Sequence, residues 1–406
     1  MTALHASSNY VAADAPLQSQ DLGTDSSYIL SIARLPGSYA ACTSAPSNKI
    51  HLLDPSTIRP ILSLSGHDSG TTSLRVVNAV ANISKPSLVS SGLDGSIQVW
   101  DERTNTYSIK MTDLGQSTGI LCCDVSEDGM TVVGGTQLQG DEAQIIYWDP
   151  RQPAAPLRRH TSTHSDNVTV LQYSPDTPNL LLSASTDGLI STSIATEDDE
   201  DEAVVHVGFW NCSVSQAGWI HSSTTTGVKI WGHSDMETFS TWSDEVPSQL
   251  AVLFILSDSL QLDLRQSQDI RDPSLHNHSQ YEWHTDYLIN CHSSKTSPDL
   301  KVFVGSNQGD FALLSNGDLS QPGAPWRLMN SWSNGHSDVV RSLYWDEKNS
   351  VIITGGEDSK INLWNAPSSF DSAGLDDAME VDSPPPDSRK RDRENDDSHG
   401  GKRARR

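Results

Sequence analysis

One spacing of polar residues recurs along the chain, and it restricts the possible folds more than any other feature. Each copy has a histidine, a later serine or threonine, and an aspartate four residues after that hydroxyl residue. The copies are His67, Ser90, Asp94 and Trp100; His164, Ser183 and Asp187, with Ser193 in the tryptophan position; and His336, Thr354, Asp358 and Trp364. A chain with such a repeat is expected to be built from repeated structural units.

Each aspartate lies in a predicted turn between two short strands. The dipeptide Asp94-Gly95 favours a two-residue hairpin turn, because glycine adopts the positive φ that such a turn needs. We therefore expect one strand to end near Ser90 and a second to cover residues 97–100. Alternate side chains of the second strand face opposite sides, and both sides carry large residues. The pattern predicts a sheet that is packed on both faces.

The recurring residue types can form a buried polar network. Histidine, a hydroxyl group, a carboxylate and the indole N–H can satisfy one another's hydrogen bonds. Left unpaired inside a sheet, each group would cost on the order of 1–3 kcal/mol. The network would tie the loop before a sheet to the turn between its middle strands. Because it recurs once per unit, we interpret these residues as structural, and we expect no catalysis, no metal and no cofactor.

The sequence as a whole resembles the WD-repeat family. Gly66-His67 followed by Trp100-Asp101 is similar to the repeat that forms one four-stranded blade of a β-propeller. Weaker copies lie at residues 28–54, 119–151, 213–231 and 287–314. The resemblance implies an all-β, seven-bladed WD-repeat β-propeller over residues 28–365. We expect a strand within residues 8–22 of the N-terminal segment 1–27 to complete the last blade.

One interval in the repeat is too long. Trp231 and its counterpart Leu314 are 83 residues apart, whereas the preceding intervals are 48, 45 and 38 residues. We expect an insertion at about 243–284, and the alternative is an eighth, degenerate blade around residues 248–265.

Four segments are similar to the family of WD repeat-containing protein 89, in a divergent version of fungal type. They are EDDEDEAVVHV (197–207), SVSQAGWI (213–220), DYLINC (286–291) and the last repeat, 335–365. This resemblance implies a nuclear scaffold for protein–protein interactions without catalysis of its own.

Composition excludes several classes of function. The formal net charge is −25, and residues 366–406 hold ten of the 52 acidic and eight of the 27 basic side chains. The rest of the chain is therefore strongly acidic, and direct nucleic-acid binding is not expected. No signal peptide is recognised, and the apolar run 250–256 is much shorter than the roughly 20 residues of a membrane-spanning helix. The five cysteines form no CxxC pair and indicate buried, reduced thiols.

The C-terminal segment differs in composition from the rest of the chain. Residues 366–406 are polar and charged, so a disordered tail is expected. Two basic clusters resemble a bipartite nuclear localisation signal that an import receptor reads. They consist of Arg389, Lys390, Arg391, Arg393, Lys402, Arg403, Arg405 and Arg406. We therefore predict a nuclear protein, with the cytoplasm as a second compartment.

Two sets of residues are candidates for partner binding. The first lies on the propeller face that carries the turn before the third strand of each blade: Leu93, Thr186, Asp338, Arg341 and Glu357. The second is a pair of Trp-Asp-x-Arg boxes that end in Arg103 and Arg151. Such boxes resemble those by which substrate receptors dock on the adaptor of cullin-4 ubiquitin ligases. This is the alternative to a general scaffold.

Two further features have weaker interpretations. The acidic run 197–202 is typical of a solvated loop, with contact to basic proteins as the alternative. The residue types of His276, His278, His284, Cys291 and His292 suit zinc, but their spacing matches no familiar zinc module. No metal is expected there.

Overall fold

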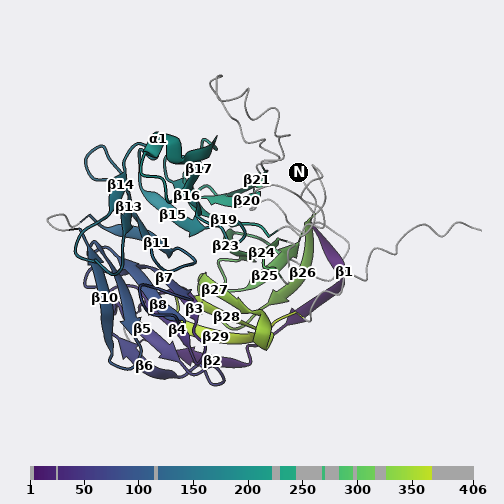
Figure 1. The fold of residues 1–406 in the computed structure, drawn as a ribbon. Coiled ribbons are helices and arrows are strands. Elements are labelled where there is room, and N and C mark those ends of the chain that lie inside the picture. Colours follow the sequence, from purple (N-terminus) through teal and green to yellow (C-terminus); the bar gives the residue numbers. More distant parts are fainter. Residues whose placement is uncertain are drawn as a thin grey trace, which may run out of the picture. The chain divides into compact units, whose positions relative to one another are not determined.

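The strands form seven sheets, each of which is one blade (Figure 1). The structure is a computed structural model that describes residues 4–23, 26–113, 118–221, 229–243, 268–269, 283–295, 300–315 and 326–367. The predicted seven-bladed, all-β propeller is confirmed. Most of the predicted insertion, the alternative eighth blade at 248–265 and the tail lie outside the described residues.

The first four blades each contain four consecutive antiparallel strands. Blade 1 is β3 (Ile29–Arg34), β4 (Tyr39–Thr43), β5 (Ile50–Leu53) and β6 (Pro60–Leu64). Blade 2 is β7 (Thr71–Val77), β8 (Ser87–Gly92), β9 (Ser96–Asp101) and β10 (Thr106–Thr112). Blade 3 is β11 (Ile120–Val125), β12 (Val132–Thr136), β13 (Ile145–Trp148) and β14 (Arg158–His160). Blade 4 is β15 (Val168–Tyr173), β16 (Leu180–Ser185), β17 (Leu189–Ile194) and β18 (Val204–Phe209), with the short helix α1 (Glu200–Ala203) before β18.

The last three blades are less regular. Blade 5 is β19 (Val214–Trp219), β20 (Lys229–Ser234), β21 (Thr238–Ser243) and the two-residue β22 (Gln268–Asp269). Blade 6 is β23 (Tyr287–His292), β24 (Lys301–Gly305), β25 (Phe311–Ser315) and β26 (Trp326–Trp332). Blade 7 is β27 (Val340–Asp346), β28 (Val351–Gly356) and β29 (Lys360–Asn365), with the short 3-10 helix η1 (Glu347–Asn349) after β27.

The N-terminal segment supplies an outer strand to two successive blades. β2 (Gln18–Asp21) pairs antiparallel with β29, so the outer strand of blade 7 comes from within residues 8–22. β1 (Leu4–Ala13) pairs parallel with β26 and makes blade 6 five-stranded, which the sequence did not indicate. A buried cluster reinforces the junction of blades 7 and 1, where Asp346 accepts hydrogen bonds from Tyr39 Oη at 2.7 Å and Arg34 Nε at 3.0 Å.

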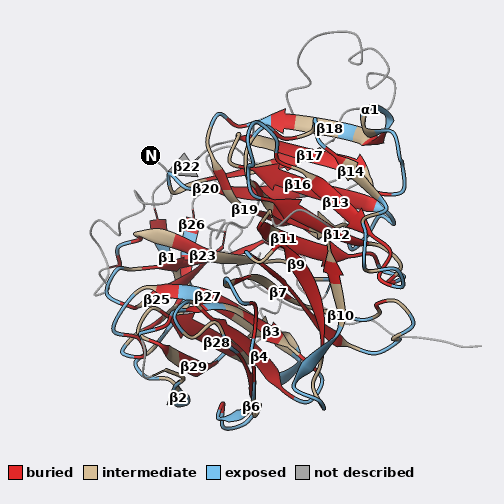
Figure 2. Ribbon diagram, turned by 90° about the vertical axis from the view of Figure 1, so that its left-hand side faces the viewer, coloured by how far each residue is buried: buried red, intermediate tan, exposed pale blue. Residues whose placement is uncertain are grey.

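The core lies within and between the blades. Middle strands such as β8 and β9 are almost entirely buried, whereas β6 and β10 expose residues to solvent (Figure 2). Apolar side chains of neighbouring blades form joint clusters, as where Leu35 and Leu52 of blade 1 meet Leu74 of blade 2. Burial of this apolar surface is the main stabilising contribution to the fold.

Side-chain hydrogen bonds also link the innermost strands of adjacent blades. Thr72 Oγ1 donates to the carbonyl oxygen of Ile120 at 2.6 Å, and Thr169 Oγ1 donates to that of Val214 at 2.7 Å. Donors from Cys122, Gln216, Asn290 and Ser342 make the corresponding bonds at four further junctions. Among the described residues the junction of blades 1 and 2 has no such bond.

The cysteines lie as thiols within the described part of the chain. Cys42, Cys122 and Cys123 are buried, and burial raises the pKa of the Cys42 thiol to about 12. A raised pKa makes these thiols poor nucleophiles. Among the described residues, no helix has the length and apolar character needed to cross a membrane.

Candidate protein-interaction face

The structure brings the recurring residues of blades 2 and 7 together. In blade 2, Ser90 Oγ accepts from Trp100 Nε1 at 2.8 Å and lies 2.8 Å from His67 Nε2. The other ring nitrogen of His67 lies 2.9 Å from Asp94 Oδ1. Blade 7 has the same network. Trp364 Nε1 donates to Thr354 Oγ1 at 2.9 Å, His336 Nε2 lies 2.8 Å from Thr354 Oγ1, and His336 Nδ1 lies 3.0 Å from Asp358 Oδ1. In each blade, this network holds the turn between the second and third strands against the loop that precedes the blade.

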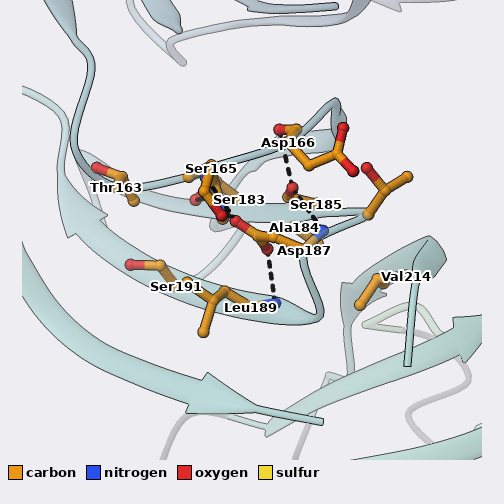
Figure 3. A network of polar contacts seen from close by, with 12 residues as sticks. Thr163, Ser165, Asp166, Ser183, Ala184, Ser185, Asp187, Leu189, Ser191 and Val214 are labelled. Carbon is orange, nitrogen blue, oxygen red and sulfur yellow. Dashed lines mark hydrogen bonds and ion pairs between the residues drawn. The ribbon is translucent and has the colours of Figure 1, made fainter. Parts of the chain in front are cut away.

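Blade 4 contains a shorter version of the network (Figure 3). His164 Nε2 lies 2.8 Å from Ser183 Oγ, and His164 Nδ1 lies 3.4 Å from Asp187 Oδ2. The Asp187 carboxylate instead accepts from the backbone N–H of Leu189 and Ser165, both at 2.8 Å. Ser193, in the tryptophan position, is buried.

The network sets the charge state of its aspartates. Burial alone raises the pKa of Asp94, but the hydrogen bond and charge of His67 and the hydrogen bond from Ser96 outweigh it, so the pKa lies at about 2. The pKa of Asp187 and that of Asp358 are also lowered by their histidines and by backbone N–H donors, against the effect of burial. All three turns therefore carry a carboxylate at neutral pH.

The three aspartates differ in their second oxygen. Asp187 Oδ2 accepts from the N–H of Ser165, and Asp358 Oδ2 accepts from the N–H of Ser337 at 2.9 Å. In both cases the donor is the residue after the histidine. Within the described residues, the buried Asp94 Oδ2 has no hydrogen-bond partner. Blade 2 thus leaves one carboxylate oxygen unsatisfied.

Blade 5 has a different histidine network, which sequence analysis missed. His233 comes from the second strand, β20, and not from the loop before the blade. Its Nδ1 lies 2.9 Å from Ser215 Oγ, and its Nε2 lies 2.9 Å from Glu237 Oε2. Glu237 also accepts from the N–H of Leu288 in blade 6 at 3.2 Å. No spacing shared with the other blades could have revealed it.

One face of the propeller is strongly acidic. We call it the turn face, and it consists of the loops before the first strands and the turns between the second and third strands. The described residues of these loops and turns hold a single lysine or arginine, Lys49, and fourteen acidic residues. The acidic residues are Asp68, Asp94, Asp113, Asp141, Glu142, Asp166, Asp187, Asp235, Glu237, Asp286, Asp310, Asp338, Glu357 and Asp358.

The opposite face is more balanced. Its described loops hold thirteen acidic residues and six basic ones, which are Arg59, Lys85, Arg103, Arg151, Lys295 and Lys348. Six of the acidic residues belong to the run 197–202. Part of that run is folded against the body, since Glu200 accepts from the N–H of Thr161, Ser162 and Thr163 at 2.7–2.9 Å. Asp198 pairs with Arg158 at 3.1 Å.

The predicted partner-binding residues occupy the turn face in different ways. Leu93 is 37% exposed, and Asp338 is exposed in the loop before blade 7. Arg341 forms an ion pair with Glu357, and Thr186 donates its backbone N–H to Asn167 O at 3.0 Å. Exposed Leu138 and Met236 lie in turns of the same face, which the sequence did not single out.

A bulge shared by all blades places further side chains near this face. The register of each innermost strand shifts by one residue close to its start. Such bulges redirect a side chain. The bulged residues are Leu30, Thr72, Leu121, Thr169, Ser215, Ile289 and Arg341. They add Leu30, 38% exposed, and Arg341 to the surface available to a partner.

The two Trp-Asp-x-Arg boxes lie at the other ends of blades 2 and 3. Arg103 binds Asp101 through Nε and Nη2, both at 3.0 Å, and Arg151 binds Asp149 in the same way at 2.9 and 2.8 Å. The side chains are 79% and 51% exposed. The ion pair within each box is sufficient to explain why aspartate and arginine occur together. Both arginines are nevertheless exposed enough to contact another protein.

The histidines considered for zinc do not come together in the described residues. His276, His278 and the nuclear-targeting residues 389–406 lie outside them. His284 pairs with Asp286 at 3.1 Å, and His292 pairs with Glu347 at 2.8 Å. In the part of the chain that the structure describes, no group of three residues has the arrangement of a metal site.

Comparisons with known proteins agree with this architecture. The family model for the WD domain, G-beta repeat (WD40), matches residues 58–101, 156–191 and 327–365, which overlap blades 2, 4 and 7. These are the three blades that carry the recurring residues.

Similar proteins occur in distant organisms. The chain is 26% identical to WD repeat-containing protein 89 homolog of Dictyostelium discoideum, over 86% of this chain and 85% of that protein. It is 26% identical to WD repeat-containing protein GTS1 of Arabidopsis thaliana, over 84% of this chain and 82% of that protein. An uncharacterised WD repeat-containing protein of Saccharomyces cerevisiae is also 26% identical, over 79% of this chain and 75% of that protein. A fungal origin of this chain stays a prediction.

Proposed function

We propose that this chain, which is a WD40-repeat protein, acts as a scaffold that binds other proteins through its turn face. The observation that carries the proposal is the combination of exposed apolar side chains and a nearly uniform negative charge on a rigidly braced surface. Exposed apolar residues within a polar surface mark interaction sites, and loops held by a rigid framework commonly carry them.

The residues that the structure describes offer no support for catalysis by this chain. WD40 propellers are generally scaffolds without catalytic activity. In each of the three histidine–aspartate pairs the histidine also lies at hydrogen-bond distance from a serine or threonine of its blade, so we assign the pairs a bracing role.

A matched pair of leucines tests which face binds. Leu138 and Leu157 belong to the same blade, are 41% and 57% exposed, and lie on the turn face and the opposite face. We expect Leu138→Lys to reduce the set of proteins that co-purify with the full-length chain, and Leu157→Lys to leave it unchanged. Loss of partners only in Leu157→Lys would contradict the proposal.

We also propose that the protein acts in the nucleus. The support is the pair of basic clusters at 389–393 and 402–406 and the likeness to the family of WD repeat-containing protein 89. Deletion of residues 388–406 should shift a fluorescent fusion towards the cytoplasm. Unchanged nuclear localisation in imaging would refute the assignment of these clusters.

A second candidate function is that of a substrate receptor on a cullin-4 ubiquitin ligase. The exposure of Arg103 and Arg151 in equivalent positions of neighbouring blades favours it. The double variant Arg103→Ala/Arg151→Ala should then lose co-purification with the cullin-4 adaptor and keep the partners of the turn face. Absence of the adaptor from the wild-type preparation would refute this role.

A further inference from the structure

Three buried oxygen atoms without partners surround one loop of the turn face. The loop is Gly66–Gly70, which precedes blade 2. Within the described residues, Asn48 Oδ1, Thr71 Oγ1 and Asp94 Oδ2 accept no hydrogen bond. The Thr71 residue is only 3% exposed. Buried polar atoms are normally hydrogen-bonded, so three together need an explanation.

Contacts place these atoms on the two sides of the loop. The Asn48 carbonyl lies against Gly66, and Asn48 Oδ1 lies 3.8 Å from the position that a Cβ atom on Gly70 would occupy. Leu93 Cδ1 lies at the same 3.8 Å, and the Leu93 N–H donates to Gly70 O at 3.0 Å. Asp94 follows Leu93 and binds His67 within the loop.

The repeat provides an internal control for this arrangement. In blades 4 and 7 the equivalent carboxylate oxygen accepts from the N–H of the residue after the histidine. In blade 2 that residue is Asp68, and its N–H makes no such bond among the described residues. The junction of blades 1 and 2 is also the one without a side-chain bond between inner strands. Among the three recurring networks, the carboxylate oxygen without a donor is therefore specific to blade 2.

The residue types of the three oxygens determine which kind of side chain could bind them. The cluster offers a carboxylate oxygen, an amide oxygen and a hydroxyl, and exposed Asp68 adds a second negative charge beside it. Lysine and arginine side chains carry several donors and no acceptor. The Thr71 hydroxyl can also donate, but the carboxylate and amide oxygens only accept, so a side chain with several donors matches them best.

We propose that the junction of blades 1 and 2 on the turn face is a subsite for a lysine or arginine side chain of a protein partner. The inference rests on the proposed function, because it assigns a binding chemistry to the same face. The cation enters by displacing the exposed Leu93 side chain, which lies against Gly70 together with Asn48. Its donors then bind the three oxygens, and Asp68 holds the charge at the rim.

Peptide binding to the full-length protein tests the subsite. The probe is a short fluorescent peptide of alternating alanine and arginine, and its control replaces arginine by neutral citrulline. Thr71→Val and Asp68→Asn should each weaken binding of the arginine peptide about tenfold, as expected for the loss of a hydrogen bond to a charged group. The citrulline peptide should bind about tenfold more weakly to the wild-type protein.

Asp235→Asn is the matched control, because it removes one exposed charge from the same face in blade 5 and is not one of the predicted partner-binding residues. It should change binding by less than about twofold, since the remaining attraction is screened by salt. Equal losses in Asp68→Asn and Asp235→Asn, or no loss in Thr71→Val, would overturn the subsite. Either outcome leaves the Leu138 and Leu157 comparison intact, so failure of the subsite is distinct from failure of the scaffold.

Discussion

Blades 2 and 4 share a histidine, a serine and an aspartate at the same positions, yet their networks differ at both ends. In blade 2, Ser90 binds both His67 and the Trp100 indole, and Asp94 stays close to the histidine. Among the described residues of blade 4, no tryptophan binds Ser183, and Asp187 Oδ2 accepts from the N–H of Ser165, a bond that Asp94 Oδ2 lacks. The difference indicates that the tryptophan extends the chain of hydrogen bonds, whereas histidine, serine and aspartate are sufficient to hold the turn.

The largest expected effect comes from removing the central hydroxyl in each blade. Ser90→Ala leaves two buried groups without a partner, Trp100 Nε1 and His67 Nε2, and should lower the free energy of unfolding by about 2–5 kcal/mol. Ser183→Ala leaves only His164 unsatisfied and should cost about 1–3 kcal/mol. Urea denaturation of the two variants measures both values. Equal losses would show that the tryptophan contributes nothing to the network.

Protonation of the Asp94 carboxylate at low pH should lower the free energy of unfolding of the protein. The pKa of this carboxyl is about 2 in the folded protein, below the roughly 3.9 of an unfolded aspartate. Its contribution is therefore complete above about pH 4 and is lost as the pH falls towards 2, up to about 2 kcal/mol.

The variant Asp94→Asn isolates this contribution. It should be less stable than the wild type at pH 7 but lose less stability between pH 5 and pH 3 in urea denaturation. Asp187→Asn should behave in the same direction, because its pKa is also lowered. Parallel pH curves for Asp94→Asn and the wild type would contradict the assignment.

Equivalent substitutions in the innermost strands of blades 2 and 4 should lower the free energy of unfolding by similar amounts, because the two histidine networks differ only outside these strands. Thr72 and Thr169 each donate to a carbonyl of the next blade. Thr72→Val and Thr169→Val should each cost about 1 kcal/mol in the same denaturation experiment. A clear inequality would mean that blade 4 differs from blade 2 along its whole length.

The smallest expected effect is that of Thr71→Val, next to Thr72. Its hydroxyl has no partner among the described residues, so an isosteric methyl group removes no hydrogen bond and should leave stability unchanged or slightly raised. A loss comparable to that of Thr72→Val would reveal a partner for this hydroxyl and would count against the cation subsite.

The sequence predicts the fold well where residues that touch are also regularly spaced. Asp94, Ser90 and Trp100 belong to one hairpin, and the repeat makes their spacing visible. Tyr39 and Asp346 are 307 positions apart, and their hydrogen bond depends on closure of the ring. No local pattern predicts it.

The candidate site was predictable only in part. The positions of Leu93 and Glu357 on the turn face could be predicted, because each directly precedes a repeated aspartate in a predicted turn. The network of His233 uses another strand, and Glu200 belongs to a charged run that sequence alone assigns to solvent. The unsatisfied oxygen of Asp94 results from one missing backbone bond, which no residue type reveals.

The N-terminal segment supplies outer strands to both blade 6 and blade 7, and this affects how the chain can fold during synthesis. Residues 4–21 leave the ribosome before blades 1–5, whereas their partner strands β26 and β29 follow those blades. Blades 1–5 can form while the chain grows, whereas closure waits until translation reaches residue 365. During that interval two strand edges stay uncovered, so the slowest and most aggregation-prone stage of folding should be the final one.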